Sequence, residues 1–80
     1  MTITQLKQEV LGIIQDSTET TFEITENTHL IRDLGLSSME AMMVVTDLED
    51  RFGIRIAASK LRQVQTVADL TGLVIEALRA

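Results

Sequence analysis

The sequence predicts an all-α fold: a small bundle of three main helices plus one short helix, with a long loop between the first two. Apolar residues recur at helical spacing in three separate stretches, and no Pro interrupts them. At 80 residues the chain fits a single domain, residues 1–80, whose limited burial favours a simple helical core. Neither an internal repeat nor a low-complexity segment occurs.

The first helix is predicted to start at Thr2 or Thr4, either of which can cap it, and to run to about Asp16. Its apolar residues at helical spacing are Ile3, Leu6, Val10, Ile13 and Ile14. From Ser17 to Leu36 no period is sustained, and a structureless loop of that length is unusual in a compact domain. We therefore expect its apolar residues to pin it across the bundle, namely Phe22, Ile24, Leu30, Ile31 and Leu34.

The second helix is predicted from Ser38 to about Phe52, with Gly53 as its C-terminal stop. A short helical turn is expected near residues 57–62. The last helix begins after Thr66, where Asp69 forms a weaker analogue of a capping box. Its apolar face predicts burial of Val67, Leu70, Leu73, Val74 and Leu78.

The start of the second helix places a bare hydroxyl on its first turn. Ser37 followed three residues later by Glu40 is a capping-box pattern, and Gly35 can break the segment before it. Ser37 is thus the predicted N-cap, and Ser38 falls at the first helical position. There its side chain is not needed for the cap, and unpaired backbone N–H groups carry partial positive charge. A phosphodiester on Ser38 would be favoured, although the two serines can also be read as a plain helix start.

The second helix has two apolar faces at about 100° per residue. One face, which we assign to the core, comprises Ala41, Val44, Val45, Leu48 and Phe52. Nearly opposite lies a second stripe formed by Met39, Met42 and Met43, with Ser38 at the edge between the two faces. Met suits surfaces that adapt to several partners, so the stripe predicts a partner surface.

Composition excludes several classes of function. A net charge of −5 disfavours nucleic acid and anionic membranes as main partners and favours basic protein surfaces. With two aromatic residues, base stacking is not expected. With no Cys, neither a disulfide, a thiolate metal site nor a cysteine nucleophile is available. No run approaches the roughly 18 apolar residues of a membrane span, and no signal peptide is evident, so we expect a cytoplasmic protein.

Catalysis and metal binding by the chain itself are not expected. His29 has no Cys or second His to complete a metal site, so a structural or solvated loop histidine is the better interpretation. The acidic cluster at 47–50 does not have the spacing of a calcium loop. Nothing resembles a nucleophile elbow, an oxyanion loop or a Gly-rich phosphate loop. We therefore expect neither catalytic nor metal-binding residues.

A longer motif carries a family resemblance. Asp33-Leu34-Gly35-x-x-Ser38-Met39, followed by a helix ending in Leu-Glu-Asp-x-Phe-Gly-Ile, resembles the acyl carrier proteins and related thiolation domains over nearly the whole chain. The resemblance implies that Ser38 carries 4'-phosphopantetheine, supplied by coenzyme A, whose terminal thiol holds acyl groups as thioesters. One departure is Ser37, where the family usually has Asp. Ser caps as Asp does, but a negative charge beside the attachment site is lost.

In that family the second helix is the side that client enzymes contact. Glu49 and Asp50 match positions that are usually acidic and Asp47 adds a carboxylate, whereas Met43 replaces a frequent Glu and Arg51 reverses a charge. The partner-binding residues implied are therefore Met39, Met42, Met43, Asp47, Glu49 and Asp50. The family's usual shielding of the acyl chain further implies cargo contacts at Val45, Ile54 and Ile56.

The resemblance implies a free-standing, monomeric carrier for fatty acid, polyketide or related biosynthesis, a substrate of enzymes and not itself an enzyme. Its implied partners are a phosphopantetheinyl transferase and acyl-loading, condensing and acyl-processing enzymes with basic or apolar docking surfaces. Two alternatives stay open. One is a peptidyl or aminoacyl carrier of a nonribosomal pathway; the other is an unmodified helical interaction module in which the serines only cap the helix.

Overall fold

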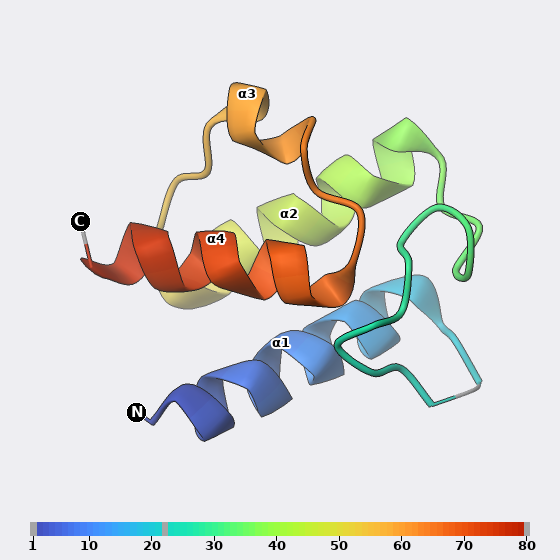
Figure 1. Cartoon of the computed structure of the whole chain (residues 1–80), viewed down its shortest axis with the longest axis horizontal. Helices are drawn as coiled ribbons and strands as arrows, with labels where there is room; N and C mark the ends of the chain where they lie inside the picture. Colours follow the sequence, from blue (N-terminus) through green and yellow to red (C-terminus); the bar gives the residue numbers. More distant parts are fainter. Residues whose placement is uncertain (1, 22, 80) are drawn as a thin grey trace.

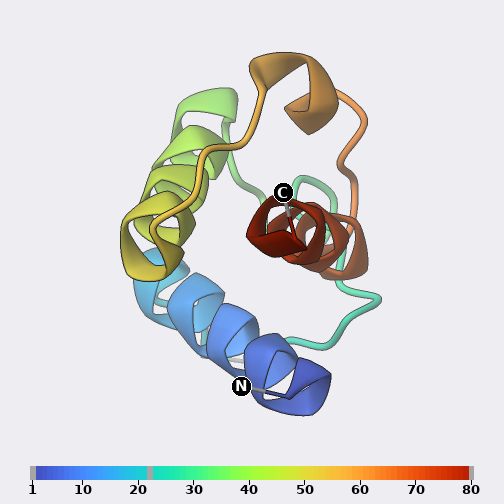
Figure 2. The ribbon, with the colours of Figure 1, turned by 90° about the vertical axis from the view of Figure 1, so that its left-hand side faces the viewer.

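The all-α prediction is confirmed by the structure, a computed structural model that describes residues 2–21 and 23–79. Its helices are α1 (Ile3–Thr18), α2 (Ser38–Phe52), α3 (Ala58–Leu61) and α4 (Val67–Arg79). The three longer helices form the body, and the one-turn α3 stands apart from α1 (Figure 1). Figure 2 looks nearly along α4 and shows the other three helices placed around it. None of the helices in the described ranges is both long and apolar enough to cross a membrane.

Side-chain caps define where the long helices begin. The Thr2 hydroxyl accepts a hydrogen bond from the Gln5 N–H (3.1 Å), and the Gln5 side chain accepts one from the Thr2 N–H (2.9 Å). Each such cap satisfies backbone donors that have no partner within the helix. α1 ends at Thr18, two residues beyond the predicted end, with Glu19 in the left-handed region at φ 53°. At the end of α2, Gly53 adopts φ 65°, the conformation that its predicted role as a stop requires.

The core lies where α1, α2 and α4 meet. Its largest fully buried side chains are Ile14, Leu48, Leu70, Val10, Val67 and Val74. Full burial of each contributes about 1.5–3 kcal/mol. The prediction that Leu78 is buried is wrong, because this residue lies in the last turn of α4 and is 46% exposed. Ile3, in the first turn of α1, is also exposed.

Backbone hydrogen bonds pin the loop between α1 and α2 to the start of α4. The Val67 N–H donates to the Thr28 carbonyl (3.0 Å), and the Leu30 N–H donates to the Gln65 carbonyl (2.9 Å). Ile24, in the same loop, is buried. The predicted pinning is thus confirmed for Ile24 and Leu30, which are buried, and Leu34 is half-buried. Ile31 departs from the prediction because it is half exposed, and Phe22 lies outside the described residues.

Asp69 stabilises the same crossing from the α4 side. Its carboxylate accepts hydrogen bonds from the Gln65 N–H (3.0 Å) and the Thr66 N–H (3.1 Å). The Thr66 hydroxyl in turn accepts from the Asp69 N–H (3.2 Å), which completes the predicted capping pair. The two backbone hydrogen bonds stabilise the charged carboxylate and lower the pKa of Asp69 below its ordinary value of 3.8.

Candidate functional site

The capping box predicted at the start of α2 is formed. Ser37 has an extended backbone, and its hydroxyl accepts a hydrogen bond from the Glu40 N–H (3.1 Å). The Glu40 carboxylate accepts one from the Ser37 N–H (3.1 Å). The Ser37 hydroxyl is therefore engaged in holding the helix start.

Ser38 is placed differently from its neighbour. It is the first residue of α2, its side chain is exposed, and its hydroxyl has no hydrogen-bond partner among the described residues. First-turn N–H groups have no partners inside the helix, and together with the helix dipole they favour negative charge. A phosphate ester at Ser38 would gain this stabilisation without disturbing the cap.

The loop before α2 is folded on itself, which fixes the direction from which the chain enters the helix. Gly35 takes φ 67° and its N–H donates to the Ile31 carbonyl (2.9 Å). The Nδ1 atom of His29 accepts hydrogen bonds from the Ile31 N–H (3.2 Å) and the Arg32 N–H (2.9 Å). The Asp33 carboxylate accepts from the His29 N–H (2.7 Å). His29 is thus a structural loop residue, as its isolation in the sequence indicated.

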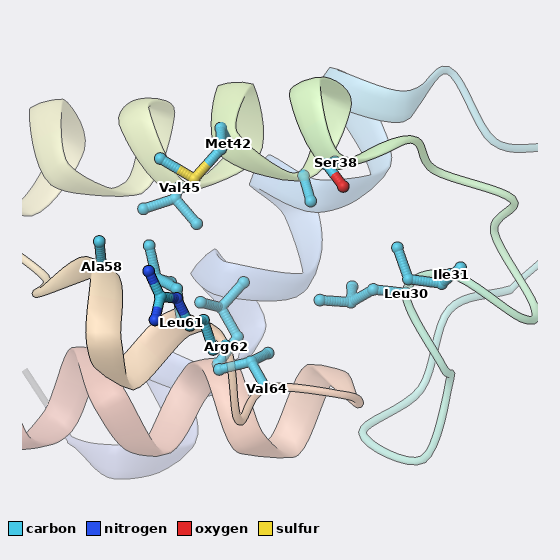
Figure 3. Close-up of a pocket in the computed structure, with 11 residues that line it drawn as sticks. Leu30, Ile31, Ser38, Met42, Val45, Ala58, Leu61, Arg62 and Val64 are labelled. Carbon is cyan, nitrogen blue, oxygen red and sulfur yellow. The ribbon is translucent and has the colours of Figure 1, made fainter.

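A cavity of about 330 Å³ opens beside Ser38, between α2, α3 and the start of α4. Ser38 stands at one end with Leu30 and Ile31, while Met42 and Val45 face the α3 residues along it (Figure 3). The lining residues are Leu30, Ile31, Ser38, Ala41, Met42, Val45, Ala58, Leu61, Arg62, Val64 and Leu70. This size lies at the lower end of the range for small-molecule sites, about 300–1,000 Å³, and the mostly apolar lining is typical of them.

The methionines do not share one environment. Met39 and Met43 are 76% and 62% exposed and stand on the face of α2 away from the core. Met42 is 49% exposed and lines the cavity. The outward face of α2 is therefore apolar at Met39 and Met43, and Met42 joins it to the cavity mouth.

The acidic residues of α2 also differ in their contacts. Asp47 accepts a hydrogen bond from the Ser17 hydroxyl (2.6 Å), which ties α2 to the end of α1. Glu49 is half-buried, and its carboxylate accepts from the Ile56 N–H (2.8 Å), which holds the segment between α2 and α3. Asp50 is exposed on the outward face. Together with Glu40 of the capping box, three of the four acidic residues of α2 thus have contacts within the chain.

The cavity is lined by some residues that the sequence indicated and by others that it did not. Val45 lines it as expected. Ile54 is instead buried in the core, and Ile56 lines a separate hollow between α3 and α4. Neither isoleucine lines this cavity, so cargo contacts at Ile54 and Ile56 stay a prediction. The residues that sequence reasoning missed are Leu30, Ile31, Ala58, Leu61, Arg62 and Val64.

Comparisons with known proteins agree with this geometry. Residues 2–74 match the family described as phosphopantetheine attachment site. An acyl carrier protein of Saccharopolyspora erythraea is 34% identical over 74 residues, covering 92% of this chain and 72% of that protein. One from Lactobacillus acidophilus is 32% identical over 68 residues, covering 79% of this chain and 85% of the relative.

Solved structures show the same fold. A Mycobacterium tuberculosis structure, provisionally described as an acyl carrier protein, superposes with a TM-score of 0.84 at 31% identity, covering 89% of this chain and 96% of that one. An acyl carrier protein from Thermotoga maritima superposes with a TM-score of 0.80 at 24% identity, covering 96% and 91%, and supports the fold alone.

The family match and the shared helical fold together define a carrier domain for a covalently attached group. The chain belongs to the acyl carrier protein family, whose phosphopantetheine attachment domain it contains. Domains of this kind are sites of covalent 4'-phosphopantetheine attachment. The residues present fit that group, because the Ser38 hydroxyl is exposed and uncommitted and an apolar cavity opens beside it.

Proposed function

We propose that Ser38 is the residue that carries the 4'-phosphopantetheine arm. The observation that carries this assignment is the difference between two adjacent hydroxyls: Ser37 Oγ is bonded to the Glu40 N–H, whereas Ser38 Oγ is exposed and has no partner among the described residues. Ser38 also borders the cavity, so an arm attached there can bring its far end back across the lining.

Attachment needs a separate enzyme. An isolated serine hydroxyl is a weak nucleophile, and no base lies within hydrogen-bond distance of Ser38 Oγ in the described part of the chain. A transferase must therefore remove the hydroxyl proton of Ser38 while Ser38 Oγ forms a bond to the diphosphate phosphorus of coenzyme A that bears the pantetheine. The phosphoanhydride bond breaks, and the nucleotide portion leaves with the electron pair.

We further propose that the cargo is an acyl group held as a thioester for fatty acid, polyketide or related synthesis. The support is the largely apolar lining of the cavity, which suits a hydrocarbon chain. The chemistry itself belongs to the client enzymes. Of the implied partner residues, Met39, Met43 and Asp50 lie on the outward face of α2, which we propose as the docking surface.

Mass spectrometry of the intact chain tests the attachment. Incubation with coenzyme A and a broad-specificity phosphopantetheinyl transferase is expected to add one phosphopantetheine to the wild-type chain and to Ser37→Asp, which keeps a capping side chain. Ser38→Ala should gain no mass. An unchanged wild-type mass, or a gain that persists in Ser38→Ala, would overturn the assignment.

The class of cargo is tested on the loaded chain. Offered in parallel to an acyl-activating and an aminoacyl-activating enzyme, the loaded chain is expected to be charged by the former. Exclusive charging by the aminoacyl-activating enzyme would instead support a carrier of a nonribosomal pathway.

A further inference from the structure

Among the described side chains that line the cavity beside Ser38, one is charged. Arg62, at the C-terminal end of α3, stands in a lining that is otherwise apolar except for Ser38 itself. Figure 3 shows its side chain on the α3 side of the cavity, with Ala58 and Leu61, across from Met42 and Val45 on α2. Arg can lay its aliphatic stem along apolar side chains while its charged end stays at the opening. A long apolar chain alone would not require a cation in this position.

Three carboxylates around α3 have partners within the chain. Glu76 of α4 forms an ion pair with Lys60 of α3. Asp69 accepts two backbone N–H groups before α4, and Glu49 accepts the Ile56 N–H before α3. No hydrogen bond or ion pair joins the Arg62 guanidinium to any residue in the described ranges.

A guanidinium in an apolar cavity is well suited to bind a carboxylate. It is planar, permanently charged and shaped to bind a carboxylate through two parallel hydrogen bonds. Apolar walls lower the local dielectric, which strengthens such a contact relative to open water. Because the net charge of the chain is −5, a local cation favours an anionic cargo in this cavity.

We propose that Arg62 is a specificity-determining residue of the cavity and that the carrier favours acyl groups whose far end bears a carboxylate over simple alkanoyl groups of equal length. The proposal rests on the proposed attachment at Ser38, since cargo reaches the cavity only from that residue. The apolar lining contacts the methylenes of such a cargo, and Arg62 binds its terminal carboxylate.

The test compares two cargos of matched length. The transferase loads hexanoyl- or adipoyl-phosphopantetheine from the corresponding coenzyme A thioesters, and intact mass verifies loading. Cleavage of each thioester by hydroxylamine is then timed, with the free coenzyme A thioesters as references. Relative to these references, we expect the adipoyl group on the wild-type chain to be cleaved about threefold more slowly than the hexanoyl group, a modest factor because Arg62 is exposed.

Two arginine variants decide whether Arg62 causes the difference. Arg62→Gln should abolish it, and Arg55→Gln should preserve it, because Arg55 is also exposed but lies outside this cavity. As a second readout, the Arg62 Nε–H NMR signal should shift with the adipoyl cargo and not with the hexanoyl cargo. Equal protection of the two cargos, or a preference that survives Arg62→Gln, would overturn the proposal. Failure to load either cargo would instead contradict the attachment at Ser38. Intact mass detects this failure before any cleavage is timed, so it is distinguishable from a failure of the cargo proposal.

Discussion

At the scale of single residues, two adjacent serines have different surroundings. The Ser37 hydroxyl accepts the Glu40 N–H and belongs to the capping box, whereas the Ser38 hydroxyl is exposed on the first turn. The sequence predicted this difference because a capping box depends on residues three positions apart. It did not predict the contact of Glu49, whose carboxylate bonds to the Ile56 N–H, since that contact depends on how the chain turns after α2.

Ser37→Ala tests the capping role. Loss of the cap is expected to lower the free energy of unfolding by about 1 kcal/mol, measured by urea denaturation followed by circular dichroism. Ser37→Asp should stay close to wild type because Asp caps equally well. Ser38→Ala should change stability by less than about 0.5 kcal/mol. Equal losses of stability in Ser37→Ala and Ser38→Ala would contradict the assignment of the capping role to Ser37 alone.

At the scale of elements, local signals predicted the helices well. Apolar periodicity and capping residues lie within a few positions of each other, so both ends of α1 and α2 and the start of α4 were predicted to within about two residues. The short α3 is less well defined by sequence: its N-cap, Ala57, makes no side-chain hydrogen bond, and α3 spans four residues, whereas 57–62 were predicted. The exposure of Leu78 was missed because periodicity does not show where neighbouring elements end.

The start of α4 should lose stability in acid. Hydrogen bonds from the Gln65 and Thr66 N–H groups lower the pKa of Asp69 in the folded chain. The ionised carboxylate therefore contributes stability that is fully present above the unfolded pKa and is lost as pH falls through the lower folded pKa.

Asp69→Asn tests this contribution. At about pH 7 the variant is expected to be less stable than wild type by about 0.5–1 kcal/mol, because a charged group near a helix start is lost. In urea unfolding at successively lower pH, the difference should narrow below the ordinary value of 3.8. A difference that stays constant across this range would contradict the role of the charge.

At the scale of the whole molecule, the cavity arises from elements distant in sequence. Its walls come from the loop at Leu30, from α2, from α3 and from the start of α4. The apolar residues of α2 could be identified from the sequence. Which of them face α3 depends on the path of the segment after Gly53. That path takes Ile54 into the core and leaves Val45 at the cavity.

Narrowing the cavity tests its role in shielding cargo. Ala58→Leu adds bulk to the lining, and because Ala58 is exposed, the fold should be retained. We expect hydroxylamine to cleave a hexanoyl thioester several-fold faster on this variant than on the wild-type chain. Ala57→Leu is the matched control, since Ala57 is exposed and lines a different hollow. Equal cleavage rates in wild type and both variants would show that the cavity does not shelter the thioester.

The central claim is that the arm is attached to Ser38 and not to its neighbour. Its most direct test is fragmentation of the loaded wild-type chain in the mass spectrometer, with fragment ions that separate Ser37 from Ser38. We expect every fragment that contains Ser38 to carry the phosphopantetheine mass and every fragment that contains Ser37 without Ser38 to lack it. Phosphopantetheine on Ser37, or on a residue outside the start of α2, would contradict the account.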